Sequence, residues 1–337
     1  MTILIRPARS DDLQSLYEMA KLTGGGFTNL PADREALAKK LARSAEAFAS
    51  ETEAAEDHLY LLVLEDRATG RVGGTAQLFS SIGQSAPFYS YRMGTLSQYS
   101  RELGRTFRAE MLTLTTDLEG SSEVGGLFLH PRQRAGGLGL LLARSRYLFI
   151  RQHRARFAAQ VVAELRGVID EAGGSPFWDG LAGKFFGMGF QEADAFNAVN
   201  GHQFIADLMP KHPIYTAMLP ESARHVIGLP HPSGRAAMRM LEAEGFAHRG
   251  YFDIFDGGPT MAAQTDTIKS VATAREATIG TIGPGGAQAL IATGRLHDFR
   301  AAYACIIEHE DGSVTIDNEA AALLDVVVGD RLLHVAR

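Results

Sequence analysis

The sequence contains a single cysteine, Cys305, and no excess of positive charge. One cysteine excludes an intrachain disulfide, a CxxC redox pair and a zinc site built from several cysteines. Lysine and arginine number 33 against 39 aspartates and glutamates, so the formal net charge is −6 and no basic surface for nucleic acid is expected. The HExxH pattern of zinc peptidases is also missing. We therefore expect neither a metal site nor a nucleic-acid partner.

Long apolar segments are lacking as well. The most apolar helical stretch, 138–150, contains Arg144 and Arg146 and is too short to cross a bilayer. The first residues lack the charged and apolar regions of a secretory signal. With 45% hydrophobic and 21% charged residues, the composition is that of a folded globular protein. We expect a cytoplasmic protein without a membrane partner, in which 337 residues suggest about two domains.

The distribution of apolar residues predicts a mixed α/β (α+β) fold. We expect strands at 3–7, 58–65, 71–80, 124–129, 157–165 and 249–255, the second and third forming a hairpin. We expect helices at 33–49, 138–152, 176–187 and 233–244, and an earlier helix capped by Ser10 and ended by a loop at 23–26. Short strands separated by turns predict a small β-rich module at the C-terminus.

The segment 127–139 carries the most specific local pattern. An apolar strand is followed by a basic loop with the spacing Arg134-x-x-Gly137-x-Gly139, and an apolar helix then begins near Leu138. Glycines let a backbone approach an anion closely, and the unpaired N–H groups of a first helical turn bind phosphate. The spacing is neither a Walker loop nor a dinucleotide fingerprint. The alternative is a glycine-rich turn that binds no ligand.

Two further segments share one design, a helix followed by Gly-Phe. They are 178–190 and 236–246, and both are expected to lead from a helix into a strand. Glycine and a following apolar residue also end ordinary helices, so each segment alone is weakly informative. Together they suggest that the chain contains two related halves.

The strand, the loop with Arg-x-x-Gly-x-Gly and the helix resemble the coenzyme A pyrophosphate loop of the GNAT acyltransferase superfamily. Longer phrases, in order, resemble the arginine N-succinyltransferase family; they lie at 21–26, 91–96, 120–123, 162–171, 175–178, 208–215, 226–232 and 253–260. The resemblance covers about residues 3–262 and fades beyond them. It implies a GNAT-like mixed sheet with flanking helices at 1–200, a second, degenerate GNAT-like segment at 201–262 and the β-rich module at 263–337.

The resemblance also implies a reaction. A succinyl group would pass from succinyl-CoA to the α-amine of L-arginine, with succinyl-CoA as a co-substrate and no tightly bound cofactor. Leu127 would contact succinyl-CoA, and Arg134, Gly137, Leu138 and Gly139 would hold its pyrophosphate. His231, between two prolines, would be the proton donor, a role that suits an imidazole titrating near neutral pH. The chain could act alone, as a homo-oligomer, or as the alpha subunit of a heterodimer with a paralogous beta subunit.

Both substrates carry charges that need complementary partners. The acids within the matching phrases are Glu123, Glu164, Asp170, Asp253 and Asp256, and the cations are Arg92, Arg166 and Lys211. From these we select a substrate-binding set; its members are Glu123, Arg166, Lys211, His212 and Asp256. Structural ion pairs or solvated charges are the alternative for each.

Two other functions stay open at this point. One is a different CoA-dependent N-acyltransferase, with acetyl-CoA as donor or with ornithine or a polyamine as acceptor. The other is a non-catalytic CoA-binding subunit. The presence of His231, Arg134, Gly137 and Gly139 disfavours the second.

Overall fold

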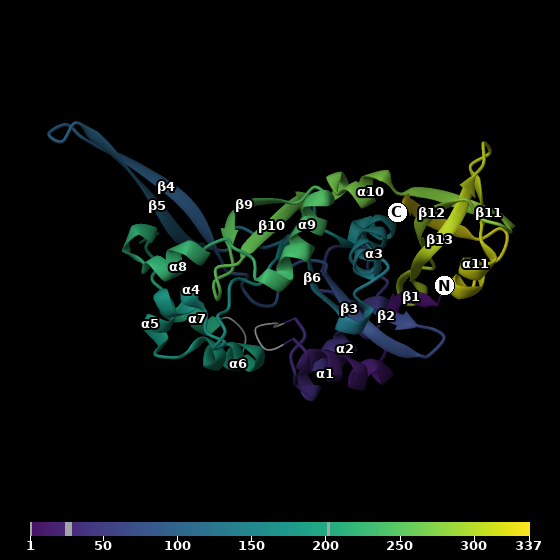
Figure 1. Cartoon of the computed structure of the whole chain (residues 1–337), viewed down its shortest axis with the longest axis horizontal. Coiled ribbons are helices and arrows are strands. Elements are labelled where there is room, and N and C mark those ends of the chain that lie inside the picture. Colours follow the sequence, from purple (N-terminus) through teal and green to yellow (C-terminus); the bar gives the residue numbers. More distant parts are fainter. Residues whose placement is uncertain (1, 24–28, 201–202) are drawn as a thin grey trace.

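The strands join into one long sheet that runs along the molecule (Figure 1). The computed structural model describes residues 2–23, 29–200 and 203–337, so most of the loop expected at 23–26 lies outside the described residues. Within that part of the chain the strand order is β12-β15-β11-β14-β13-β1-β2-β3-β6-β7-β10-β9-β4-β5-β8. None of the helices described there is long and apolar enough to span a membrane.

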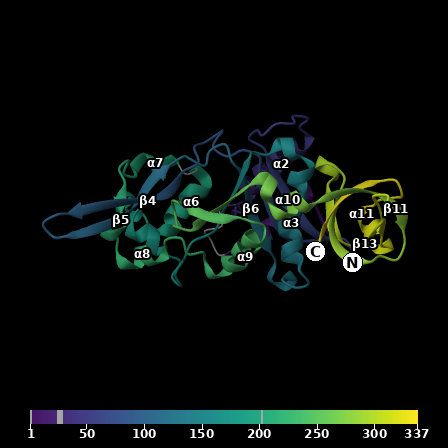
Figure 2. The same cartoon turned by 90° about the horizontal axis from the view of Figure 1, so that it is seen from above.

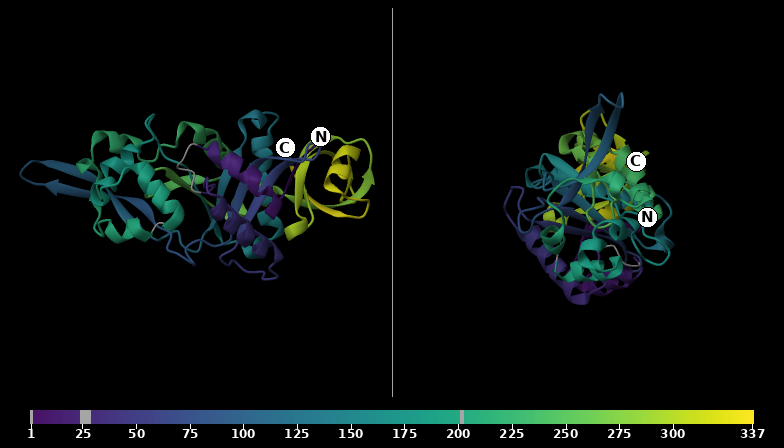
Figure 3. Two further views of the ribbon diagram at one scale, coloured as in Figure 1. Left: turned by 90° about the horizontal axis from the view of Figure 1, so that it is seen from below. Right: turned by 90° about the vertical axis from the view of Figure 1, so that its left-hand side faces the viewer.

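The N-terminal third of the chain forms the middle of the sheet. Its antiparallel strands are β1 (Ile3–Pro7), β2 (Leu59–Asp66), β3 (Arg71–Phe79) and β6 (Ser122–Leu129). Helices α1 (Leu13–Lys21) and α2 (Arg34–Ala49) cover one face, as the view from below shows (Figure 3). The predicted β2–β3 hairpin and the helix at 33–49 are confirmed, because β2 is apolar throughout its buried part and Asp33 caps α2 through Ala36 N.

The first helix begins differently from the prediction. Ser10 does not cap it; residues Ser10–Asp12 form a short 3-10 turn instead. The Asp12 carboxylate accepts the Arg9 amide N–H at 2.7 Å and pairs with the buried Arg6 guanidinium at 2.8 Å. The expectation was wrong because a longer-range ion pair to β1 determines which residue satisfies the helix start.

Helix α3 (Leu138–Gln152) and strand β7 (Gln160–Glu164) follow β6, and α3 lies on the other face from α1 and α2 (Figure 2). Later in the chain, α9 (Arg235–Ala243), β9 (Ala247–Phe252) and β10 (Pro259–Gln264) complete this part of the sheet. Strand β10 lies between β7 and β9, antiparallel to both. Residues from 201–262 therefore extend the same sheet as residues from 1–200.

The two helix–Gly–Phe segments differ in structure. After α9, Gly245 and Phe246 lead into strand β9, as expected. After the first segment, Gly189 and Phe190 lead into a helix, so the expectation of a strand there was wrong. Phe190 is buried in a local apolar cluster around Trp178, and this packing favours a helical continuation.

Residues 81–121, 176–200 and 203–226 form a part of the molecule that the patterning did not predict in detail. Strands β4 (Ser90–Ser100) and β5 (Arg105–Thr115) make a hairpin that projects from one end (Figure 1). Small elements pack beside its base; they are α4 (Pro176–Gly180), α5 (Gly183–Phe186), α6 (Phe190–Asn200), α7 (Gln203–Leu208), β8 (Ile214–Tyr215) and α8 (Glu221–Val226).

The C-terminal strands lie at the opposite end and have an apolar core of their own. The elements are α10 (Lys269–Thr273), β11 (Arg275–Ile282), β12 (Ala287–Thr293), β13 (Arg300–Glu308), β14 (Ser313–Ile316), α11 (Asn318–Leu324) and β15 (Arg331–Ala336). Strand β13 pairs with β1 through Ile5 and Ala301. The β-rich character predicted for this end is confirmed, and the short pairing with β1 joins it to the main sheet.

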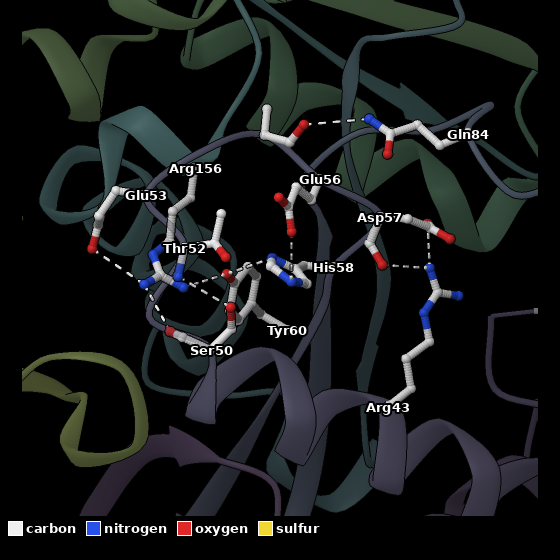
Figure 4. A network of polar contacts seen from close by, with 11 residues as sticks. Arg43, Ser50, Thr52, Glu53, Glu56, Asp57, His58, Tyr60, Gln84 and Arg156 are labelled. Carbon is white, nitrogen blue, oxygen red and sulfur yellow. Dashed lines mark hydrogen bonds and ion pairs between the residues drawn. The ribbon is translucent and has the colours of Figure 1, made fainter.

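The connection between α2 and β2 is fixed by a buried cation (Figure 4). The Arg156 guanidinium, which follows α3, donates to Tyr60 Oη at 3.2 Å, to Ser50 O at 2.9 Å and to Glu53 Oε1 at 3.2 Å. A buried charge is stable only when it is paired and hydrogen-bonded. These contacts join the segment after α3 to β2 and to the end of α2.

Candidate active site

Strands β6 and β7 are parallel neighbours that pair over two positions only. The paired positions are Ser122 with Val161 and Glu123 with Val162, although β6 continues to Leu129. Beyond Glu123, β6 pairs with β3, and β7 pairs with β10. The facing edges of β6 and β7 therefore carry backbone groups that another extended chain could pair with.

Leu127 lies on this unpaired edge, next to a backbone irregularity. Gly126 has φ +56°, and the register between β3 and β6 shifts there. The Gly126 carbonyl accepts from the Thr75 hydroxyl at 2.8 Å, on the β3 side. Because C=O and N–H point in opposite directions across a trans peptide, the Leu127 N–H is directed away from β3 and toward the unpaired edge.

The predicted phosphate loop connects β6 to α3. Gly136 and Gly137 have φ +63° and +79°, values that glycine adopts readily. Within the described residues, the amide N–H groups of Gly136, Gly137 and Gly139 donate to no backbone oxygen. The Arg134 side chain folds back, and its Nε donates to Leu129 O at 3.0 Å. The loop thus presents unpaired N–H groups at the start of a 15-residue helix, an arrangement suited to a phosphate.

His231 is held in one orientation by its neighbour Ser233. Its Nδ1 accepts from the Ser233 amide at 3.2 Å and lies 2.7 Å from the Ser233 hydroxyl. With Nδ1 accepting, the neutral ring carries its proton on Nε2. The Ser233 hydroxyl can also accept from Nδ1 when the ring is protonated, so the ring orientation suits both states. Nε2 is then the atom through which the ring can transfer a proton.

His231 is fixed against the end of β7. Its amide N–H donates to the Arg166 carbonyl oxygen at 2.7 Å. The ring is half-buried, and burial together with the nearby Arg166 guanidinium lowers its pKa below the ordinary value of 6.5. The structure therefore brings the predicted proton donor beside one of the predicted substrate-binding cations.

Four carboxylates gather on the same side of these strands; they are Glu123, Glu164, Asp253 and Asp256. Burial raises the pKa of Glu123 to about 7, although Lys40 and Asn29 oppose the change. Burial and the charges of Asp253, Glu123 and Asp256 raise the pKa of Glu164 well above its usual range. Such a group of acids is stabilised by an added cation.

Asp253 and Asp256 shape the turn between β9 and β10. Asp256 accepts the Gly167 amide at 2.7 Å and the Gly258 amide at 2.8 Å, and Asp253 accepts the Phe255 amide at 2.6 Å. Burial and the neighbouring Asp253 raise the pKa of Asp256 to about 8. Since both Asp256 oxygens already accept backbone N–H groups, its first role is to hold this turn against Gly167.

Two cations near β6 and β3 did not emerge from the sequence. Lys40 on α2 donates to Asn29 O at 2.7 Å and to Gln77 Oε1 at 3.1 Å, and burial lowers its pKa to about 8. Arg146 on α3 is buried and its Nη1 lies 3.4 Å from Gly125 O on β6. Both occupy helix positions among other charged residues, so only the tertiary fold reveals that they point at β6 and its neighbours.

The remaining predicted residues lie elsewhere. Lys211 and His212 are exposed in the turn between α7 and β8. Arg92 forms an exposed ion pair with Asp117 at 3.1 Å, and Asp170 accepts amides within its own turn. An open hollow beside the β4–β5 hairpin, lined by Met93, Phe107, Arg224 and other residues, contains none of the predicted site residues.

The partly paired parallel strands, the loop with Arg-x-x-Gly-x-Gly and the order of elements around them are those of a GNAT-like acyltransferase. More specifically, the chain belongs to the arginine N-succinyltransferase family. The family model described as arginine N-succinyltransferase beta subunit matches residues 3–270, and the model of its C-terminal domain matches residues 270–336. The family match thus extends past residue 262, where the resemblance read from the sequence ended.

Individual relatives agree with this assignment. The chain is 44% identical over 302 residues to proteins named arginine N-succinyltransferase from Salmonella paratyphi B and Salmonella newport, covering 89% of this chain and 88% of each relative. It is also similar to the solved structure of arginine/ornithine succinyltransferase subunit AI from Pseudomonas aeruginosa. That match has a TM-score of 0.91 and 34% identity, and it covers 99% of this chain and 98% of the other.

Proposed function

We propose that this chain is an arginine N-succinyltransferase that transfers a succinyl group from succinyl-CoA to the α-amine of L-arginine. The observation that carries the proposal is the 44% identity across 89% of the chain to relatives bearing that name. The residues around β6 and β7 would serve the separate chemical steps. Aminolysis of a thioester requires a bound donor, a neutral amine, a stabilised oxyanion and a protonated thiolate.

The donor would bind along β6. The unpaired amides of Gly136, Gly137 and Gly139 and the positive end of α3 would receive the pyrophosphate. The pantetheine arm would pair with the free edge of β6, as an added strand pairs with a sheet. The Leu127 N–H, directed away from β3, would then hold the thioester carbonyl oxygen and stabilise the developing oxyanion.

The acceptor would bind beside the carboxylate group. Glu123, Glu164, Asp253 and Asp256 outnumber the nearby cations Lys40 and Arg166, so the site favours a cationic ligand such as arginine. Glu123, buried among these acids, is suited to pair with the guanidinium of arginine. Lys211 and His212 remain predicted contacts, although they lie on the exposed turn between α7 and β8.

The succinyl carboxylate needs a cation close to the thioester. Arg146 reaches β6 at Gly125 from the α3 face, and Arg166 follows β7 beside His231. Of the residues that the structure describes, no carboxylate lies within ion-pair distance of the Arg146 guanidinium. A buried guanidinium without such a partner gains most from an anionic ligand.

His231 would complete the reaction. The attacking nitrogen gives up its extra proton to water, the tetrahedral intermediate breaks its carbon–sulfur bond, and the departing thiolate takes a proton from Nε2 of the protonated ring. Ser233 keeps Nδ1 engaged, so the ring does not need to turn between protonation states. A general acid or base of this kind contributes about 10²–10⁴-fold to the rate.

Two aspects of the proposal concern partners. The solved relative is titled a subunit and names ornithine beside arginine, so ornithine is the second candidate acceptor. We propose that the chain carries a complete site, whether it works as a homo-oligomer or beside a paralogous subunit. Glu123, Leu127, Arg134 and His231 all come from this one chain.

A thiol-release assay on the purified chain tests the function. We expect succinyl-CoA to exceed acetyl-CoA, and arginine to exceed the uncharged citrulline, by about a hundredfold or more in kcat/KM, since leaving a buried charge unpaired costs several kcal/mol. Ornithine in place of arginine at equal rates would broaden the acceptor class. Equal rates with acetyl-CoA and with citrulline would refute the charge-based recognition and leave a generic acyltransferase.

A further inference from the structure

We propose that Tyr303 and Arg337 are positioning residues. They hold the CoA phosphate loop from the side that faces the C-terminal strands and so orient its amide groups. The inference rests on the proposed function, because it concerns how that loop binds the pyrophosphate of the donor. It gives the C-terminal strands a part in donor binding in addition to their own packing.

The two side chains contact consecutive carbonyl groups of the loop. Arg337 Nη2 donates to Gly136 O at 2.8 Å, and Tyr303 Oη donates to Gly137 O at 3.0 Å. They also contact each other, since the Arg337 guanidinium carbon lies 4.4 Å from the centre of the Tyr303 ring. A cation over an aromatic face is a favourable arrangement that limits the freedom of a long side chain.

These contacts determine where the loop amides point. In a planar trans peptide the N–H lies opposite the C=O. Holding Gly136 O toward the C-terminal strands therefore turns the Gly137 N–H to the other side of the loop. That N–H donates to no backbone oxygen in the described part of the chain, so it is available to a phosphate. Both glycines have positive φ values, and without the Arg337 contact the peptide plane between them could rotate easily, whereas the Gly137 carbonyl is also held by the Leu141 amide at 3.0 Å.

A side chain built at Gly137 gives independent evidence for the position of Tyr303 and Arg337, the pair that we call the clamp. Its Cβ would lie 2.7 Å from Arg337 Nη2 and 3.5 Å from Tyr303 Oη. The Cα of Gly137 thus faces the C-terminal strands, which leaves the opposite side of the loop for the ligand. The clamp thus lies on one side of the loop, and we expect the donor to bind on the other.

The C-terminal strands are fixed relative to α3 by a second group of contacts. Arg144, on α3, donates to Ala336 O at 2.9 Å and to Ser270 Oγ at 2.8 Å, and it pairs with Glu244 at 3.1 Å. Arg337 Nη1 donates to the Gln288 side chain on β12. The clamp is therefore attached to rigid elements, as preorganisation of a binding loop requires.

The test compares donors with and without phosphates. Tyr303→Phe and Arg337→Gln should each weaken CoA binding, measured by calorimetry, about threefold to tenfold, the effect of one lost hydrogen bond. The KM for succinyl-CoA should rise by the same factor, while kcat and the KM for arginine stay unchanged. The KM for succinyl-pantetheine, which lacks the pyrophosphate, should not change. Tyr99→Phe on the hairpin and Arg275→Gln on β11 are matched controls that should behave as the unaltered chain.

Two results would overturn the inference. Unchanged CoA affinity in both variants would mean that the loop is oriented without the clamp. An equal rise in KM for succinyl-pantetheine would mean a general loss of structure instead of a loss of loop orientation. Since CoA binding is measured without turnover, a chain that binds CoA but does not succinylate arginine refutes the proposed function and still tests the clamp.

Discussion

The amide N–H of His231 donates to the carbonyl oxygen of Arg166 at 2.7 Å, which joins the Pro-His-Pro segment to the residues that follow β7. Through this bond the Pro-His-Pro segment lies against the end of β7, the strand that pairs with β6 over two positions only. The proposed proton donor is thus held by a backbone hydrogen bond just beyond the end of β7, the strand beside β6.

Replacement of His231 should separate binding from chemistry. We expect His231→Asn to lower kcat at least about a hundredfold, because proton transfer to the thiolate is lost. The dissociation constant for CoA should stay the same, since the phosphate loop is untouched. His225→Asn, which alters an exposed histidine on α8, is the control. A loss of less than about tenfold in kcat would assign the proton transfer to another group.

The pKa of His231 should depend on Arg166. Burial and the positive Arg166 guanidinium both disfavour the protonated ring and lower its pKa, so Arg166→Gln should raise that pKa toward 6.5. A titration of the His231 ring signal by NMR measures the change. Arg92→Gln, at an exposed ion pair, should leave the pKa unchanged. An unmoved titration in Arg166→Gln would show that burial alone lowers the pKa.

A methyl group at Gly137 should weaken donor binding by disturbing the side of the loop that faces Arg337. A side chain at this position would point at Arg337 and would strain a backbone with φ +79°. Gly137→Ala should raise the KM for succinyl-CoA about tenfold, which corresponds to about 1.4 kcal/mol. Gly104→Ala has a similar φ in open space and should keep the KM of the unaltered chain. The same KM in both variants would argue against phosphate binding at this loop.

Glu123 should determine the preference for a charged acceptor. Glu123→Gln keeps the shape of the side chain and removes its charge, so kcat/KM for arginine should fall at least about tenfold while that for citrulline changes little. Initial rates with both acceptors give the ratio. A structural role predicts instead that both substrates lose equally. Glu119→Gln, on an exposed residue of the preceding turn, is the control.

The parts of the fold with strong local patterns were predictable. The β2–β3 hairpin, α2 and α3 each have a continuous apolar run or face together with a clear cap or turn. The β4–β5 hairpin was missed because much of it is exposed on both faces, so apolar and polar residues do not alternate regularly. A periodic apolar pattern arises where one face of an element is buried, and most of the β4–β5 hairpin is not buried on either face.

The site was predictable only where it is continuous in sequence. The phosphate loop and the Pro-His-Pro phrase could be recognised from neighbouring residues. Lys40, Arg146 and the Arg337 contact with Gly136 depend on how α2, α3 and β15 pack, and no spacing in the sequence encodes those distances. Tertiary contacts of single charged side chains have no periodic signal.

The most direct test is to identify the product made by the purified chain alone. The chain is incubated with L-arginine and with succinyl-CoA that is isotope-labelled in its succinyl group. It should yield succinylarginine in which the labelled succinyl group is bonded to the α-nitrogen, as identified by mass spectrometry and NMR, together with an equal amount of free CoA. His231→Asn should form this product at least about a hundredfold more slowly. Free CoA without succinylarginine, or no turnover by the unaltered chain on its own, would contradict the claim that this single chain carries a complete succinyl-transfer site.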